Sequence, residues 1–240
     1  MRKIKTLFRP ALALIVATAL FSCNGAKKTD AADTTAAAKP AAAATAPAMK
    51  APFDVVEITH KLKDYATWRP LFNADSTFRK TAGLTDIVVG QQVDSANNVM
   101  VVLNASDVAK AKAFAADPRL KDVMTKGGVI SKPDVEYFHV IRFNPDSHEK
   151  TWVVITHKVK DFDAWVKVYD GEGTATRTSQ GMVDVALARG IDDPNLVHIV
   201  FDVTDMAKAK AAIFSDEKKK LMMSAGVEGK PEIVFYKTAE

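Results

Sequence analysis

The feature that most constrains the fold of this chain is an internal repeat. Residues 56–65, VEITHKLKDY, recur 97 positions later as residues 153–162, VVITHKVKDF, and each segment is followed by a tryptophan three residues on. After a one-residue insertion the offset becomes 98, and later pairs keep it: Arg79 and Arg177, Gly83 and Gly181, Asp107 and Asp205, Gly128 and Gly226, Pro133 and Pro231. Because the matches keep their order, the pattern predicts a tandem duplication of one domain of roughly 90 residues.

Each copy contains the same predicted elements. Apolar residues alternate with polar ones in 56–62, which is typical of a strand, and Asp64 is placed to cap a helix that Gly83 ends. A second helix starts at Asp107 and is broken at Asp117-Pro118. The remaining strands are expected at 87–89, 99–105 and 135–141, with counterparts in the second copy. The order β-α-β-β-α-β is the ferredoxin-like split motif, so the fold class is α+β.

One such unit covers a single face of its sheet with helices and leaves the other face bare. The second copy in the same chain can cover that face, so we expect the two sheets to pack face to face within a monomer. The predicted parts are a signal peptide (1–22), a lipidated Cys23 with a tether (23–52), a first repeat (53–144), a joint (145–150) and a second repeat (151–240).

The N-terminus has the pattern of an export signal. Basic residues precede an apolar run, residues 11–21, which is too short to span a bilayer, since about 20 residues are needed. The run ends in Leu20-Phe21-Ser22-Cys23, which resembles a lipobox, and Cys23 is the only cysteine of the chain. The pattern predicts an acylated Cys23 that anchors the protein to a bacterial envelope membrane. The alternative is an ordinary signal peptide. No acidic run follows Cys23, which favours the periplasmic side.

Residues 24–52 are rich in Ala, Thr and Pro and contain no aromatic or β-branched aliphatic residue. They cannot bury enough apolar surface to offset ordering, so a disordered tether is expected rather than an Ala-rich helix. Eight of the 33 basic residues but only two of the 29 acidic residues precede Phe53, which leaves the repeats with a net charge of −2. This charge does not support nucleic-acid binding.

A family resemblance rests on motifs found in both repeats. A strand ends in His-Lys-hydrophobic-Lys-Asp-aromatic, followed by Trp, then Arg-x-x-x-Gly, and later by Gly-Val and Lys-Pro. Over residues 53–238 this resembles dimeric α/β-barrel proteins, including antibiotic-biosynthesis-monooxygenase-like domains. The resemblance implies a pocket between sheet and helices. That superfamily includes cofactor-independent monooxygenases, haem-degrading enzymes and isomerases, so the resemblance does not settle an activity.

Histidines are the first candidate site residues. His60 and His157 lie on the apolar face of the first strand of each repeat and could act as general base or ligand-binding group; the alternative is a structural role. His198 has no histidine at the matching position of the first repeat, which hints at one specialised site. The five histidines are scattered, and no metal or cofactor motif is present, so the sequence predicts neither a metal site nor a cofactor.

Aromatic and basic residues complete the candidate site. Tyr65 with Trp68, and Phe162 with Trp165, could form a wall for a flat ligand, or simply a core stripe at helical spacing. Arg79 and Arg177 could bind a carboxylate or enolate; the alternative is a cation at a helix C-terminus.

Three functions are compatible with this pattern. We favour a small-molecule binding protein of the cell envelope, because no catalytic motif is recognisable. The first alternative is a cofactor-independent monooxygenase-like enzyme with a histidine as base and an arginine at the developing oxyanion. The second alternative is an interaction module with a filled core. Whether the chain is an enzyme stays open at this point.

Overall fold

The computed structural model describes residues 50–147 and 149–239. The predicted signal peptide, Cys23 and the tether up to residue 49 lie outside them. Within the described part, no helix is long and apolar enough to cross a membrane.

The first repeat consists of β1 (Phe53–Lys61), α1 (Tyr65–Ala74), α2 (Ser76–Thr81), β2 (Leu84–Gln92), β3 (Ser95–Ala105), α3 (Val108–Ala115), α4 (Pro118–Lys126) and β4 (Asp134–Phe143). The second consists of β5 (Thr151–Val159), α5 (Phe162–Glu172), α6 (Thr174–Ser179), β6 (Met182–Gly190), β7 (Leu196–Val203), α7 (Met206–Ile213), α8 (Asp216–Ser224) and β8 (Val227–Thr238).

The predicted α+β order is confirmed in both repeats, and aspartates begin the helices as expected. Asp64, Asp107, Asp161 and Asp205 have extended backbones, and each side chain accepts a hydrogen bond from the backbone N–H three residues later. These bonds satisfy donors that have no partner inside a helix.

The first helix of each repeat differs from the expectation of one continuous helix. Asp75 (φ −83°, ψ 8°) separates α1 from α2, and Gly173, with φ +80°, separates α5 from α6. A positive φ ends a helix because the next residues cannot keep its hydrogen bonds, and glycine adopts it without strain. The one-residue insertion of the second repeat lies in this segment.

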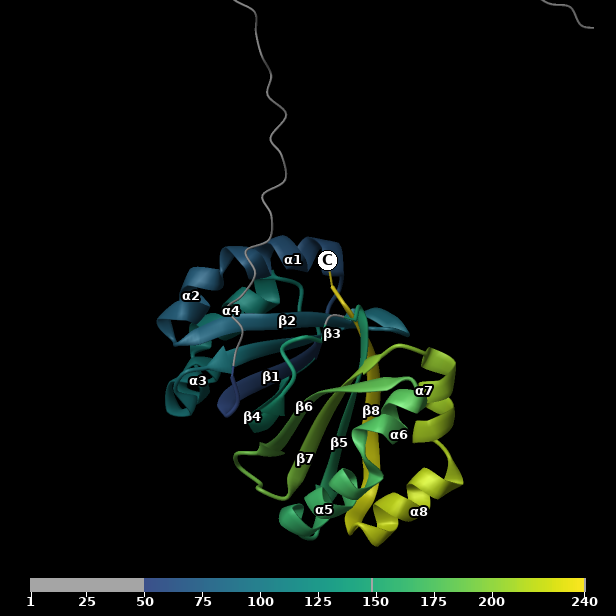
Figure 1. The fold of residues 1–240 in the computed structure, drawn as a ribbon. Coiled ribbons are helices and arrows are strands. Elements are labelled where there is room, and N and C mark those ends of the chain that lie inside the picture. Colours follow the sequence, from purple (N-terminus) through teal and green to yellow (C-terminus); the bar gives the residue numbers. More distant parts are fainter. Residues whose placement is uncertain (1–49, 148, 240) are drawn as a thin grey trace, which may run out of the picture. The chain divides into compact units, whose positions relative to one another are not determined.

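The eight strands of the described part form one closed barrel in the order β1-β3-β2-β8-β5-β7-β6-β4. The face-to-face packing expected from the sequence is therefore completed by pairing between the repeats. Strand β2 pairs with β8 through Gly90–Gln92, and β4 pairs with β6 from Phe138 to Phe143. These pairs give hydrogen-bond partners to strands that would otherwise be open edges. Helices α1–α4 lie outside one half of the barrel and α5–α8 outside the other (Figure 1).

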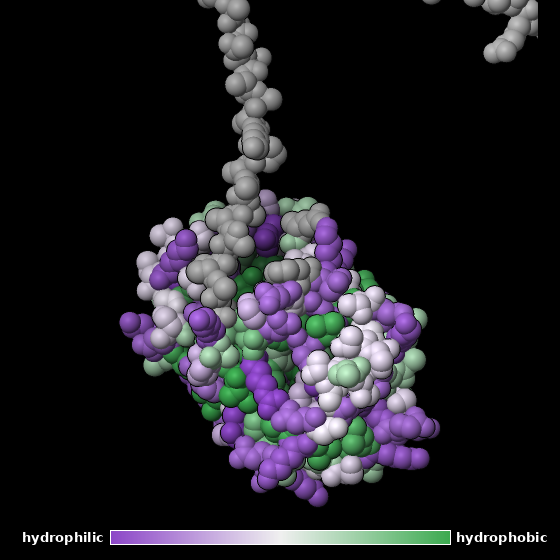
Figure 2. All heavy atoms as spheres, in the orientation of Figure 1, coloured by the Kyte–Doolittle hydropathy of each residue, from purple (hydrophilic) through white to green (hydrophobic). Residues whose placement is uncertain are grey.

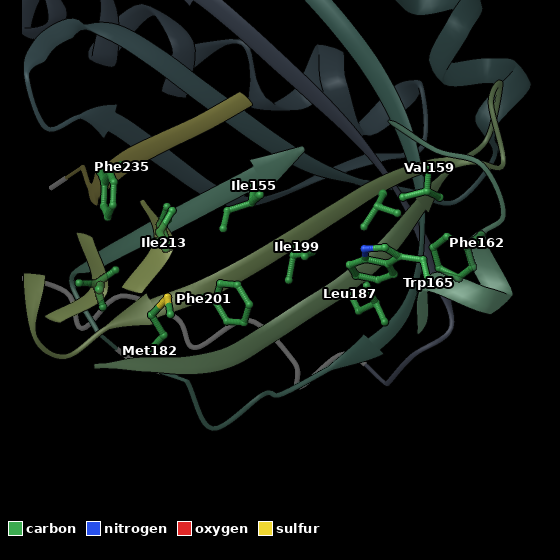
Figure 3. Close-up of a cluster of buried hydrophobic side chains, with 14 residues drawn as sticks. Ile155, Val159, Phe162, Trp165, Met182, Leu187, Ile199, Phe201, Ile213 and Phe235 are labelled. Atoms are coloured by element: carbon green, nitrogen blue, oxygen red, sulfur yellow. The ribbon is translucent and has the colours of Figure 1, made fainter. Parts of the chain in front are cut away.

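Closure of the barrel buries both faces of the strands. The outward faces pack against the helices and form one apolar cluster in each repeat. The cluster of the second repeat brings Trp165, Leu187 and Phe201 together (Figure 3). The inward faces form two smaller clusters, which contain Phe138 and Trp152. The protein therefore has a core beneath each helical layer and a third core inside the barrel.

Gly90 lies where β2 meets β8 beside the Trp152 ring. A Cβ atom at this position would overlap the ring. We expect Gly90→Ala to lower the free energy of unfolding by about 1–3 kcal/mol, because the packed ring cannot move aside without cost. Urea unfolding followed by circular dichroism measures the change. Gly171→Ala is the matched control, since no atom lies within 4 Å of a Cβ built there and Ala favours the α5 helix. An unchanged stability of the Gly90 variant would show that the ring can be displaced.

Candidate functional site

The first repeat contains a cavity of about 600 Å³ between its strands and its helices. This volume lies within the range of roughly 300–1,000 Å³ that is usual for small-molecule sites. Strands β1 and β3 provide Ile58 and Leu103 to its floor, and α1, α3 and α4 provide Trp68, Ala115 and Met124 to its walls. The lining is mainly apolar, so the cavity fits an apolar molecule better than a charged one.

His60 supplies an unusual polar group to this cavity. Its side chain lies on β1, is 7% exposed and meets the Trp68 ring edge-on at 5.7 Å between ring centroids. Neither ring nitrogen has a hydrogen-bond partner among the residues that the structure describes. Burial lowers the pKa of His60 to about 4, so the imidazole is neutral near pH 7. A neutral imidazole offers one donor and one acceptor to a ligand.

Aromatic rings form one wall of the cavity. Trp68 stacks on Phe72 with 4.8 Å between centroids, and both rings line the cavity. Tyr65 packs against Trp68 at 5.8 Å but is not among the lining residues. Of the predicted aromatic pair, Trp68 therefore lines the cavity, whereas Tyr65 only packs against Trp68.

Arg79 is held by groups of its own repeat. Its guanidinium donates to both carboxylate oxygens of Asp86, at 2.9 and 2.7 Å, and to the Phe72 carbonyl oxygen at 2.7 Å. It also lies 3.7 Å from the centroid of the Phe72 ring. Arg177 repeats this arrangement with Asp184 and Tyr169. These bonds tie the last helical turn to the next strand, which favours the structural interpretation of both arginines.

The equivalent cavity of the second repeat measures about 60 Å³. His157 and Trp165 are placed there like His60 and Trp68, and their rings are 5.3 Å apart. The pKa of His157 is also lowered to about 4 by burial. Phe162 packs on Trp165 at 6.1 Å and lies under the Arg189 guanidinium, away from the cavity.

Two side chains at the smaller cavity are larger than their counterparts in the first repeat. Phe201 and Ile213 of the second repeat stand where the first repeat has Leu103 and Ala115. Figure 3 shows Phe201 and Ile213 within the packed cluster. A half-buried ion pair of Lys218 with Glu172 also lies at this cavity. The two repeats thus share the histidine and the tryptophan but differ about tenfold in open volume.

Comparison with known proteins concerns the fold. Neither a protein-family model nor a curated protein matches the sequence. Solved structures do match. An anthrone oxidase-like protein has a TM-score of 0.53 at 13% identity, covering 80% of this chain and 93% of the other. A provisionally assigned monooxygenase from Fusobacterium nucleatum has 0.51 at 12%, covering 80% and 94%. Another from Lactobacillus acidophilus has 0.50 at 14%, covering 78% and 94%.

The folded part has the dimeric α/β-barrel fold. In this chain the two halves of that barrel are supplied by one polypeptide. At 12–14% identity the likeness shows the fold alone, so the activity has to be argued from the site.

His198 lies inside the α/β barrel and away from both sheet–helix cavities. Its ring is 5% exposed and stacks on Phe138 at 4.2 Å. Its Nε2 atom is 3.3 Å from Glu57 Oε2, and its Nδ1 atom is 3.0 Å from Thr156 Oγ1. Burial lowers the pKa of His198 to about 3. The structure therefore does not bring His198 together with His60 or His157.

Sequence reasoning missed Glu57, the partner of His198. Alternation along β1 assigns Glu57 to a polar face, yet it is 7% exposed because both faces of a closed barrel are buried. Burial raises the pKa of Glu57 to about 8, assisted by the charges of Glu136, Glu232 and Asp134. The signal that could have found it is the difference between the repeats, since Val154 occupies the matching position.

Glu57 should make stability depend on pH. Its pKa in the folded state lies above that of the unfolded chain, so its contribution is fully present below about pH 4.5 and is lost as the pH rises towards about 8. We expect the free energy of unfolding to fall, relative to Glu57→Gln, by on the order of 4 kcal/mol between about pH 5 and about pH 9. Urea unfolding across this range measures the difference.

The exposed Glu228 provides the control, because Glu228→Gln also removes one carboxyl group but leaves Glu57 in place, so it should keep the wild-type fall in stability. Parallel curves for the wild type and Glu57→Gln would show that Glu57 is already ionised in the folded protein near neutral pH.

Proposed function

We propose that this dimeric α/β barrel binds a small apolar molecule in the sheet–helix cavity of its first repeat. The observation that carries this proposal is the contrast between about 600 Å³ in the first repeat and about 60 Å³ in the second. Packing requirements alone favour the filled state, because an empty apolar cavity costs stability. An open cavity in one copy is therefore best explained by an occupant.

The chemistry of the lining indicates a flat aromatic ligand. The Trp68–Phe72 stack offers a planar apolar wall, and His60 offers one donor or acceptor at the floor. The Arg79 nitrogens already bind Asp86 and the Phe72 carbonyl oxygen. The other charged side chains of the lining, Lys121, Lys132 and Asp75, carry both signs, so the mainly apolar lining favours a neutral molecule. The volume suits about two or three fused rings, given that a cavity of about 150 Å³ holds benzene.

Binding is favoured over catalysis by the state of His60. A general base works best with a pKa near the working pH, and burial holds that of His60 at about 4. The second candidate function for the same cavity is an oxidase reaction. It is suggested by the names of solved structures with a similar fold, which include monooxygenases and an anthrone oxidase-like protein. In that case a bound substrate would have to raise the pKa of His60.

The cellular location is proposed on the sequence alone. The basic segment, the apolar run and Leu20-Phe21-Ser22-Cys23 support a lipid anchor at Cys23, with the barrel on the periplasmic side of an envelope membrane. We propose that the chain is monomeric, since each described strand has two neighbours within the barrel.

Binding can be tested with N-phenyl-1-naphthylamine, a neutral aromatic probe that fluoresces in apolar surroundings. We expect the wild type to bind it and Leu103→Phe with Ala115→Ile to bind at least tenfold more weakly, because these residues fill the second repeat's cavity. His60→Ala should weaken binding about threefold to tenfold through the loss of one hydrogen bond, and His157→Ala is the matched control without effect. Probe fluorescence at fixed protein concentration measures all four proteins.

Two outcomes would overturn the binding proposal. The first is unchanged probe affinity in the filled variant, if urea unfolding shows that this variant is folded. The second is oxygen uptake in the presence of anthrone that His60→Ala abolishes, because that result would establish the oxidase reaction in the same cavity.

The anchor is tested by metabolic labelling with radioactive palmitate in a bacterial host. We expect the wild-type chain to be labelled and to enter the detergent phase of a Triton X-114 separation, because acyl chains on Cys23 bind micelles. Cys23→Ser should be unlabelled and remain in the aqueous phase, and Ser22→Ala should behave like the wild type. An unlabelled wild-type chain that is nevertheless processed would indicate an ordinary signal peptide.

A further inference from the structure

A second hollow lies inside the barrel, separate from the sheet–helix cavities. It measures about 220 Å³ and is lined by inward-facing side chains of both repeats. Its lining is mainly apolar, with Phe53, Met100, Val140 and Trp152 among its residues, and Glu57, His198 and Asp202 are its buried polar side chains. Asp202 already accepts hydrogen bonds from the Ser147 hydroxyl and the Glu149 backbone N–H. An apolar cavity of about 150 Å³ accepts benzene, so this one has room for a single substituted ring.

The polar groups of this hollow form a chain across the repeats. His198 from β7 contacts Thr156 of β5 through Nδ1 and Glu57 of β1 through Nε2. Within residues 50–147 and 149–239, no group donates a hydrogen bond to the other carboxyl oxygen of Glu57. One hydrogen-bonding oxygen is therefore left for a molecule in the hollow.

Trp152 adds a second group without a partner. Its indole Nε1 atom is buried and has no hydrogen-bond partner in the described part of the chain. The Trp152 ring lines the hollow and stacks on Tyr236 with 4.8 Å between centroids. An indole N–H only donates, so a ligand that satisfies it carries an acceptor.

The charges around Glu57 select against an anionic ligand. Glu57 also borders a smaller polar hollow lined by Asp134, Glu136 and Glu232. The burial of Glu57, and then these carboxylates, raise its pKa to about 8, so the carboxyl is neutral at pH 7. A second negative charge in the same interior would meet the same repulsion and the same desolvation cost.

The polar pair is not required by the fold. At the matching positions the other repeat has Val154 in place of Glu57 and Met100 in place of His198. Those residues are buried in the barrel equally well. Keeping a polar pair in an apolar interior usually costs stability relative to apolar side chains of similar size. The asymmetry thus points to a use for the pair beyond packing.

We propose that the barrel interior is a second binding site, for a small neutral phenol held by Glu57 and His198. A phenolic hydroxyl both donates and accepts hydrogen bonds. It can therefore accept from the O–H of a protonated carboxyl group or donate to its carbonyl oxygen. Its single ring suits the hollow, whereas the larger cavity of the first repeat suits fused rings. This site stands independently of the function proposed for that cavity.

The three tryptophans allow each site to be observed separately. Trp68 lines the cavity of the first repeat, Trp165 that of the second, and Trp152 the barrel interior. The full chain with Cys23→Ser is labelled with 5-fluorotryptophan, and each Trp→Phe variant assigns one fluorine resonance. We expect phenol to shift the Trp152 resonance, and toluene to do so with about tenfold lower affinity because it lacks the hydroxyl. Benzoate should leave the Trp152 resonance unchanged.

The decisive variant exchanges the pair for the residues of the other repeat. Glu57→Val with His198→Met removes both polar partners together, which a buried site tolerates better than the loss of one. We expect this variant to bind phenol and toluene with equal affinity, so that the tenfold preference disappears while toluene binding shows that the hollow remains. Binding of N-phenyl-1-naphthylamine, reported by Trp68, should be unchanged.

Three results would overturn the interior site. The first is a wild-type Trp152 resonance that does not respond to phenol. The second is a phenol preference that survives the exchange. The third is a phenol response confined to the Trp68 resonance, which would assign phenol to the cavity of the first repeat. Failure of the interior site leaves the naphthylamine result standing, so the two proposals fail separately.

Discussion

Pairing of strand edges between the repeats is the constraint on which the rest of this structure depends. Strands β2 and β8, and strands β4 and β6, join two half-barrels into one closed ring. Without these pairs each repeat would present open edges and a bare apolar face to water. With them, every strand of the described part has a helix-facing side and an inward side, and both kinds of side contribute residues to apolar clusters. Two kinds of cavity follow, beneath the helices and inside the barrel.

Covalent duplication also frees the two halves to differ. In a symmetric dimer of identical chains, a residue that fills one pocket fills the other as well. Here the cavity of the second repeat, which Phe201 and Ile213 line, is about tenfold smaller than that of the first repeat, which Leu103 and Ala115 line. The smaller cavity leaves more side-chain contacts in the second repeat, and these contacts stabilise the fold.

Figure 2 shows that apolar side chains also gather in a hollow on the outside of the folded part, bordered by hydrophilic ones.

Repetition and alternation were enough to predict the order of elements, the helix caps and the pairing of repeats. The pocket between sheet and helices was implied only by the family resemblance. His60 and Trp68 line such a cavity, and their part in binding stays a prediction. The cavity volumes could not be predicted from the sequence, because they depend on how side chains of different sizes pack in three dimensions. The burial of Glu57 could not be predicted for another reason. A polar residue in an alternating strand indicates a solvent-facing side, but in the closed barrel this side faces the interior.

Comparison of the two repeats separates residues that the fold needs from residues that a ligand could use. The Arg79–Asp86 and Arg177–Asp184 pairs are built alike, with the same bidentate bonds and the same stacked ring, so they serve a task common to both halves. The differences lie in the first repeat's open cavity and in the Glu57–His198 pair. Each of these carries a cost in stability that its counterpart avoids. A feature that lowers stability in one repeat, where the other repeat has a more stable alternative, is the strongest physical indication of function in this molecule.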